Sequence, residues 1–532
     1  MVEEHIFTLK SLIARKRMQG KEVVLQMFDL EKFFDKEMMQ DALITCQTRD
    51  ADAKAIRCWY NLNKDTQIRV RTGVGMSEPG EVGAVIGQGT IGGALVSQAV
   101  LDDALTEHFQ PGGEEELNYG TVDMAPLLFQ DDFIHVSDKI MKARSTNRKI
   151  NQMIKERGLC LNRKKSVCLV IASKKQKLNM LAELKANPLM CGTIETKEVE
   201  SDKWLGQIIS ANGLADSVVK TIENREAKIK GACLEIVDII QDWRAQVVGG
   251  IDSALQMWEA CCIPSLLTGA GTWVNITPAA ERRLEALQHW FLRLVLRVGP
   301  GCPTPSLRWE TGVLSMRMRV WVEKLMMVQH LRNLDTSALA RNIYDEQKEK
   351  NWPGLVKETK QICLQLNIPD CNDDNISKWG VKGYRKYIIQ KCKEKDEKDL
   401  MKMAEGKTKC AKIMTEKYGK KAYMTENILS KVRKIFHTRV KMHLFASNYP
   451  KDNRFYKTDW TCRCGTNKES ESHLMNEVCL AYEDLRLKYT NLEDDDQRTS
   501  FFSDVLERRG RLEEGERRTQ DTLVAGNTTD SS

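Results

Sequence analysis

The sequence is poor in several residue types whose abundance marks a protein class. Only 12 of its 532 residues are proline, which excludes a proline-rich low-complexity chain. Its 16 cysteines are too few for a small disulfide scaffold, and most stand singly in apolar or basic stretches. The mean hydropathy of −0.44 argues against an integral membrane protein. The excess of positive over negative charge is also small. The formal net charge is only +7, which permits a nucleic-acid partner without establishing one.

What the chain does contain is ordinary for a globular protein. Hydrophobic residues make up 42% and charged residues 29% of it, so wholesale disorder is excluded. Its length suggests roughly three or four domains. The N-terminal residues are acidic and carry no apolar leader, which together with the cysteine usage predicts an intracellular protein, nuclear or cytoplasmic.

One uncharged stretch, Val82–Leu101, is long enough to be mistaken for a membrane span. Its five glycines make such a span unfavourable. Within it, Gly87–Gly92 matches the GxGxxG pattern of dinucleotide-binding sites, which predicts a NAD-dependent oxidoreductase only with a surrounding strand–turn–helix unit and a ribose-binding carboxylate. Nothing besides the glycine pattern supports that alternative.

Carboxylates stand where two predicted strand segments end. Val23–Phe28 is an apolar strand that runs directly into Asp29. Two apolar runs, Met124–Phe129 and Phe133–Val136, flank the pair Asp131-Asp132 and predict a hairpin with both carboxylates at its tip. If these strands are neighbours, three carboxylates meet at one sheet edge. Three clustered carboxylates repel one another unless divalent cations neutralise their charges. Oxygen ligands of this kind suit Mg²⁺.

The flanking segments predict further elements. A helix is expected over residues 6–18, a strand over 67–71, a helix over 94–108, a helix over 137–156 with Ser137 as its N-cap, a strand over 166–172, a short strand with a turn over 203–209 and an amphipathic helix over 282–297.

In order, these segments resemble the palm motifs of a reverse transcriptase. The motifs are Phe28–Asp35, Gln88-Gly89-Thr90 before a small-residue helix, Phe129–Asp132, Gly158–Ser166 and Lys203–Gly206. The Asp-Leu-Glu-Lys opening and a late Cys/His cluster are similar to non-LTR (LINE-type) retrotransposons. The resemblance implies an α+β fold in which a right-hand polymerase palm, an antiparallel sheet with helices, is followed by a helical thumb and connector and a small zinc-binding element.

The resemblance also implies a role for individual residues. Asp29, Asp131 and Asp132 would hold two Mg²⁺ ions, and Lys165 would approach the leaving phosphate. Phe34 would exclude a ribose 2′-hydroxyl, while Gln88 and Gly89 would lie against the templating base and the incoming nucleotide. The implied activity is RNA-directed DNA polymerisation, with an RNA template, a DNA primer and deoxynucleoside triphosphates as partners and no membrane.

The sequence departs from the family in two places. Gly93-Ala94 stands where the family usually has Ser-Pro, and only 28 residues precede Asp29, so the fingers are expected to be largely missing. The expected parts are a palm over 1–214, a thumb-like helical region over 215–345, a basic helical connector over 346–430, a zinc element over 431–490 and a charged, disordered tail over 491–532. An N-terminally truncated, catalytically inactive nucleic-acid-binding remnant is therefore the alternative to an active polymerase.

Two C-terminal features predict nucleic-acid binding. Cys462, Cys464, His473 and Cys479 offer three thiolates and an imidazole, a ligand set suited to a structural, tetrahedral Zn²⁺. Residues 378–421 hold 15 Lys and Arg against 6 Asp and Glu, with Tyr384, Tyr387 and Tyr418 among them. This pattern suits phosphate contact with base stacking, although a solvated lysine-rich helix is the usual interpretation.

Overall fold

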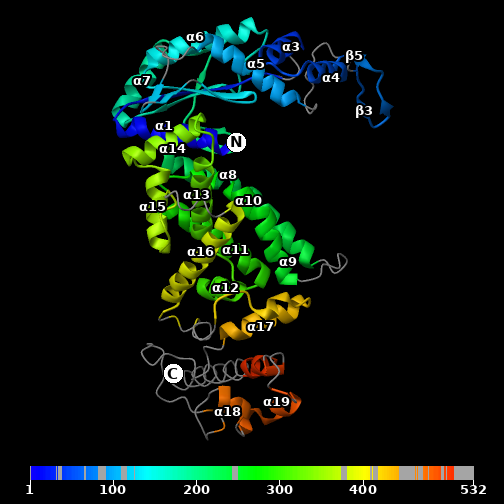
Figure 1. Ribbon diagram of the computed structural model, residues 1–532. Coiled ribbons are helices and arrows are strands. Elements are labelled where there is room, and N and C mark those ends of the chain that lie inside the picture. The colour runs from blue at the N-terminus through cyan, green and yellow to red at the C-terminus, as the bar shows by residue number, and fades with distance from the viewer. Residues whose placement is uncertain are drawn as a thin grey trace, which may run out of the picture. The chain divides into compact units, whose positions relative to one another are not determined.

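The computed structural model describes two compact units (Figure 1), each formed from separate parts of the chain. Unit 1 comprises Met1–Glu223, Thr268–Ala280 and Glu323–Val381, and unit 2 comprises Asn224–Leu267, Glu281–Val322 and Lys382–Ser532. The structure describes residues 2–508 except 32, 34–38, 65–66, 82–91, 110–116, 121, 125, 242–249, 373–379, 406, 408–409, 411–416, 442–461, 463, 465–470, 477–478, 490, 493–496 and 499. The fold is mixed helix and sheet and mostly helical, which confirms the α+β class. The predicted division into five parts stays a prediction.

Unit 1 contains every strand among the described residues. Its strands are β1 (Val23–Asp29), β2 (Gln67–Ile68), β3 (Arg71–Thr72), β4 (Gly75–Met76), β5 (Gly80–Glu81), β6 (Leu117–Tyr119), β7 (Val122–Met124), β8 (Leu127–Phe129), β9 (Asp132–Ser137), β10 (Val167–Ile171), β11 (Met190–Cys191), β12 (Ile194–Glu195), β13 (Lys197–Glu198), β14 (Ser201–Trp204) and β15 (Gln207–Ser210). Its helices are α1 (Val2–Met18), α3 (Met39–Thr48), α4 (Ala53–Asn63), α5 (Gly93–His108), α6 (Ile140–Glu156), α7 (Lys174–Ala186), η3 (Ala270–Thr272), α14 (Leu339–Lys350) and α15 (Leu355–Leu366).

A five-stranded sheet organises unit 1, in the order β13-β10-β1-β9-β8. The central strand β1 is antiparallel to both β9 and β10, and only the short β13 pairs in parallel. Six of the seven β1 residues are buried, which explains why its sequence is a continuous apolar run rather than an alternating one. This buried central strand ends at Asp29.

Alternate residues of β1 serve the two faces of this sheet. Phe28 packs in a core with Phe133 of β9 and with Leu101 of α5. On the same face, the buried Gln26 donates a hydrogen bond from Nε2 to the Ala143 carbonyl of α6 at 2.9 Å. Helices α6 and α7 lie along this face and α1 lies on the opposite one (Figure 1). Helices thus cover both faces and leave the strand ends available.

The β8–β9 hairpin confirms the predicted turn between two apolar runs. Phe129 pairs with Asp132, so only Gln130 and Asp131 form the turn. Gln130 has a φ of 56°, the left-handed conformation that a two-residue hairpin turn requires.

The predicted N-cap at Ser137 is wrong. Ser137 is the last residue of β9 and pairs with Val24, and its hydroxyl group lies 3.2 Å from His135 Nδ1. Lys139 occupies the N-cap position of α6 instead. Strand pairing therefore extends to Ser137 and delays the helix. The predicted strand at 67–71 is also interrupted, because β2 ends at Ile68 and β3 begins at Arg71.

Unit 2 is helical in its described residues. Its elements are α9 (Gly250–Met257), the π-helix η2 (Trp258–Cys262), α10 (Ile263–Leu267), α12 (Thr304–Thr311), α16 (Val381–Ala404), η7 (Ala422–Thr425), α17 (Leu429–Lys441), α18 (Glu471–Asn476), η10 (Leu480–Tyr482) and α19 (Glu483–Lys488). Three further helices, α8 (Leu214–Gln241), α11 (Pro278–Leu296) and α13 (Met316–Arg332), have residues in both units, and the first residue of α16, Val381, is the last residue of unit 1.

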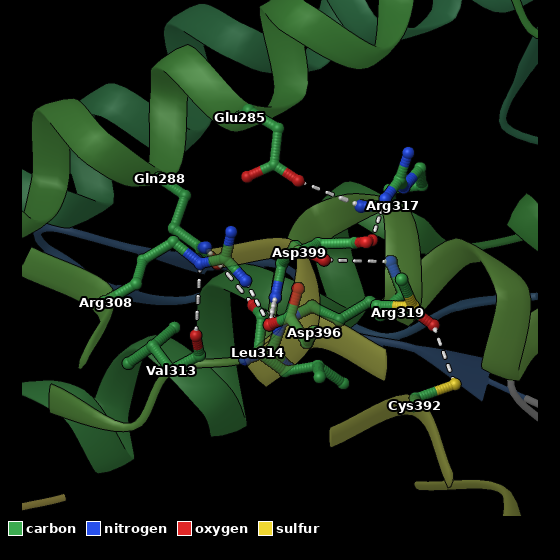
Figure 2. Close-up of polar contacts among 12 residues, drawn as sticks. Glu285, Gln288, Arg308, Val313, Leu314, Arg317, Arg319, Cys392, Asp396 and Asp399 are labelled. Atoms are coloured by element: carbon green, nitrogen blue, oxygen red, sulfur yellow. Dashed lines mark hydrogen bonds and ion pairs between the residues drawn. The ribbon is translucent and has the colours of Figure 1, made fainter. Parts of the chain in front are cut away.

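A buried ion pair organises the interior of unit 2. Arg308 of α12 and Asp396 of α16 point toward each other (Figure 2), and their side chains are 5% and 2% exposed. Asp396 also accepts a hydrogen bond from the Ser315 backbone N–H at 3.1 Å. Nearby, Arg317 and Asp399 form a pair that is more exposed. This ion pair therefore connects α12 to α16 in the interior of unit 2.

No helix among the described residues has the length and apolar character needed to cross a membrane.

Candidate functional site

Three carboxylates come together where β1 ends and the β8–β9 hairpin turns. Asp29 and Asp132 are direct partners in the antiparallel β1–β9 ladder. Asp131 is the second residue of the two-residue turn. Antiparallel pairing brings residues about a hundred positions apart in the sequence to one end of the sheet.

Lys165 lies beside this carboxylate cluster because of a tight turn before β10. The Asn162 backbone N–H donates a hydrogen bond to the Asp29 carbonyl at 2.7 Å, which anchors the turn to the end of β1. The Asn162 carbonyl accepts a hydrogen bond from the Lys165 N–H at 3.2 Å, and Ser166 Oγ accepts one from the Asp29 N–H at 3.3 Å. Lys165 Nζ consequently lies 3.1 Å from Asp29 Oδ1.

The electrostatics of the cluster are those of like charges held together. Burial first, and then the negative charges of Asp131 and Asp29, raise the pKa of Asp132 to about 6, although Lys165 lowers it. The hydrogen bond to Asp29 raises the pKa of Lys165, which therefore stays protonated. Lys165 is 67% exposed and Asp29 only 15%, so the lysine reaches the cluster from the solvent side. One lysine does not balance three carboxylates, and the cluster keeps a capacity for cations.

A fourth carboxylate, Asp202, is close enough to influence the cluster. It lies on β14, and its charge contributes to the raised pKa of Asp132. Burial raises the pKa of Asp202 itself. No local sequence pattern points to Asp202, although it directly precedes the Lys203-Trp204-Leu205-Gly206 motif, because only the position of the β14–β15 hairpin brings it near β9.

Three predicted nucleotide-binding residues, Phe34, Gln88 and Gly89, lie outside the described residues. The neighbouring Phe33 is 2% exposed and belongs to the same core as Phe28 and Phe133. Phe28 and Phe133 stack with ring centroids 4.8 Å apart directly before Asp29 and after Asp132. This aromatic packing gives the carboxylate cluster a rigid apolar base.

The four predicted zinc ligands also come together. Cys462, Cys464, His473 and Cys479 offer ligand atoms that all lie within 4.8 Å of one another. Cys462 Sγ lies 3.4 Å from Cys479 Sγ, and Cys464 Sγ lies 3.3 Å from His473 Nε2. Burial raises the pKa of the Cys462 thiol, so a metal ion must displace its proton on binding. The cluster can hold a metal ion of the kind that prefers sulfur and nitrogen.

A small apolar core surrounds this Cys/His cluster. Leu474, Tyr482, Phe501 and Phe502 are buried together with the cysteines. Arg486 Nη2 donates a hydrogen bond to the Cys479 carbonyl at 2.8 Å. The core reaches beyond residue 490, because residues 500–508 are helical and contribute both phenylalanines.

The basic segment forms a helix with one buried stripe. On α16, the buried residues recur every four positions. Tyr384 is among them at 2% exposure, and Tyr418 packs on Trp309 with ring centroids 5.4 Å apart. Tyr384 is therefore a core residue, and Tyr418 is partly buried with its ring against Trp309, so neither presents a free face for base stacking. Lys382, Lys386 and Lys393 are exposed and lie on the opposite side of the helix from Tyr384.

Comparisons with known proteins find only low similarity in sequence and structure among the matches named here. No protein-family model matches the chain, and no curated protein matches it. Among solved structures, telomerase of Candida tropicalis bound to a TWJ fragment of telomeric RNA is 12% identical, with a TM-score of 0.29 over 65% of this chain and 51% of that chain. Apo telomerase of Candida tropicalis is 9% identical, with a TM-score of 0.30 over 65% of this chain and 56% of the other. Telomerase of Candida albicans with a TWJ fragment of telomeric RNA is 9% identical, with a TM-score of 0.30 over 72% and 52%.

The chain thus spans about half the length of these telomerase chains. The likeness is distant in both sequence and fold, so the function is better judged from the geometry of the carboxylate cluster.

Proposed function

We propose that the protein is an RNA-directed DNA polymerase of the non-LTR retrotransposon type. The observation that supports this proposal is the carboxylate cluster: Asp29, Asp131 and Asp132 share one end of an antiparallel sheet, and Lys165 lies beside them. The proposal takes the five-stranded sheet as the polymerase palm. It also takes the order of the sequence motifs around these residues as the mark of the family.

The donor set of the cluster fits Mg²⁺. Three carboxylates supply only hard oxygen ligands. The pKa of Asp132 stays raised, first by burial and then by the charges of Asp131 and Asp29, although Lys165 lowers it. Asp29, Asp131 and Asp132 would be the ligands. When bound, two such ions supply activation of a primer 3′-hydroxyl and stabilisation of a leaving pyrophosphate.

The residues of the chain then have separate tasks. The β1–β9 pairing fixes Asp29 opposite Asp132, so the ligands are held in position before substrate binds. Lys165 is exposed beside its ion pair with Asp29, and it would bind the phosphates of the incoming deoxynucleoside triphosphate. Phe34, Gln88 and Gly89 would select the deoxyribose and the templating base, as the resemblance implies.

The C-terminal part of the chain would grip the RNA template and the DNA primer. The Cys/His cluster has the ligand set of a structural Zn²⁺ site, and α16 presents a row of exposed lysines. Phosphate contacts of this kind give affinity without sequence preference.

A primer-extension assay tests the proposal. The wild-type chain is expected to extend oligo(dT) on poly(rA) with dTTP and Mg²⁺, and to do so less efficiently on a poly(dA) template. Extension of neither primer, with binding of both duplexes retained, would instead identify a catalytically inactive nucleic-acid-binding remnant.

A further inference from the structure

A second group of metal-ligating side chains lies in unit 1, at the end of α15. This helix ends at Leu366, and its C-cap Asn367 has a φ of 52°, a left-handed conformation that turns the chain back on itself. The Ile368 N–H donates a hydrogen bond to the Cys363 carbonyl at 3.0 Å, so the returning segment lies against the last helical turn. The reversal brings Cys371 to Cys363 across seven intervening residues.

The two cysteines and an aspartate then share one small volume. Cys363 and Cys371 are 2% and 1% exposed. Their sulfur atoms and a carboxylate oxygen of Asp370 all lie within 4.8 Å of one another. The Cys371 backbone N–H also donates a hydrogen bond to Cys363 Sγ at 3.4 Å, a contact that favours a negatively charged sulfur.

Neighbouring helices hold these three ligands in place. Asn372 Nδ2 donates hydrogen bonds to Asp370 Oδ1 at 2.7 Å and to Cys371 Sγ at 3.6 Å. Tyr344 of α14 donates its hydroxyl proton to Asn372 Oδ1 at 3.0 Å, and Arg332 of α13 donates from Nη1 to the Cys371 carbonyl at 2.9 Å. A support of this kind, in which outer groups orient each ligand, is typical of metal sites.

We propose that Cys363, Asp370 and Cys371 form a second zinc site, separate from the Cys/His cluster. Two thiolates and a carboxylate suit Zn²⁺, and a water molecule would complete the tetrahedron. Ligand atoms around one zinc ion lie roughly 3 to 4 Å apart, so a small movement of the side chains closes the set. Binding releases the two thiol protons to solvent and changes no oxidation state.

Such a site has a clear structural consequence. It would join the end of α15 to the segment that Tyr344 and Arg332 hold, and so would connect α15 to α14 and α13. It does not depend on the proposed polymerase activity, because none of its residues belongs to the carboxylate cluster.

Metal analysis of the purified full-length chain tests the proposal. The wild type is expected to contain two zinc ions per chain by mass spectrometry. The C363S/C371S variant should retain one, and the C464S/C479S variant should also retain one. A matched control is Cys392→Ser, because Cys392 is fully buried on α16 and belongs to neither group, and it should retain two.

A cobalt titration of the wild type tests the proposal without any variant, so it does not depend on whether a variant folds. Co²⁺ added to the metal-free wild type should produce thiolate-to-metal absorption in two phases, with intensities in the ratio of three thiolates to two. Asp370→Asn keeps both thiols and should weaken only the two-thiolate phase, by at least about tenfold. One zinc per chain in the wild type, lost entirely in C464S/C479S, would overturn the proposal. A disulfide between Cys363 and Cys371 in freshly purified protein would overturn it equally.

Discussion

Asp132 is the residue at which the electrostatics of the carboxylate cluster can be measured. Its pKa of about 6 in the folded chain lies above its ordinary value of 3.8. The folded chain therefore binds this proton more tightly than the unfolded chain does. The contribution of Asp132 to the free energy of unfolding is fully present below pH 4 and is lost as the pH rises through 6. Asp132→Asn, which cannot ionise, should stabilise the fold by about 1 to 2 kcal/mol at pH 8 after allowance for solvent screening, and by almost nothing at pH 4.

Urea unfolding in the presence of a chelator, at pH 4 and at pH 8, measures this difference. Glu195→Gln is the matched control, because Glu195 is exposed on β12, and it should change stability by less than about 0.5 kcal/mol at either pH. If Asp132→Asn were less stable than the wild type at pH 8, the repulsion assigned to the cluster would be absent.

At the residue scale, local sequence patterns were sufficient to identify the members of the carboxylate cluster that stand at strand ends or in a turn. Asp29 ends an apolar run, and Asp131 and Asp132 interrupt one, so strand ends and a hairpin turn were predictable. Asp202 was not predictable, because its neighbours in sequence say nothing about the distance between β14 and β9. The same holds for Cys363 and Cys371, which meet only because Asn367 reverses the chain.

Between elements, the clearest stabilising contact is the buried pair of Arg308 and Asp396. Asp396→Ala would leave the Arg308 guanidinium buried without its partner and should lower the free energy of unfolding by about 3 to 5 kcal/mol. Asp399→Ala breaks the more exposed pair of Arg317 and Asp399, and it should lower the free energy of unfolding by no more than about 1 kcal/mol.

Chemical denaturation of the two variants beside the wild type tests this difference. The double variant R308M/D396L should recover most of the loss, since it removes both charges together. Equal losses for Asp396→Ala and Asp399→Ala would contradict the burial assigned to the α12–α16 contact.

Helix α16 should contact nucleic acid through its exposed lysines. Each phosphate contact contributes about one unit to the slope of log affinity against log salt concentration. The K382A/K386A/K393A variant should therefore bind an RNA–DNA duplex with a slope smaller by as much as about three. Lys348 and Lys357 are exposed lysines on α14 and α15, and K348A/K357A is the control that should leave the slope unchanged. The same slope in both variants would show that α16 is only a solvated helix face.

Helices and strands with a clear spacing of apolar residues were predictable from the sequence. The ends of elements that depend on strand pairing were not. The helix now seen as α1 and the strand β1 follow from their apolar spacing. Ser137 has the residue type of an N-cap, but its pairing with Val24 keeps it in a strand. Tyr384 stands among lysines, yet it is buried, because a helix can bury one stripe and expose a basic face.

For the molecule as a whole, the division of the chain was the hardest feature to predict. Each unit takes three separate parts of the sequence, and residues 268–280 and 323–381 belong with the first 223. Long-range packing decides this grouping. Buried contacts such as the hydrogen bond from Trp273 Nε1 to Gln207 Oε1, at 2.7 Å, have no local signal in the sequence.

The proposed polymerase requires that the carboxylate cluster catalyse nucleotidyl transfer with Mg²⁺. The most direct measurement is the rate of dTTP incorporation into oligo(dT) on poly(rA), compared between the wild type and Asp131→Ala, with Glu195→Gln as the control. Asp131→Ala should lose more than about 100-fold, a larger loss than outer-shell partners of a metal cause. Glu195→Gln should incorporate at the wild-type rate. Incorporation by Asp131→Ala at the wild-type rate would contradict the claim.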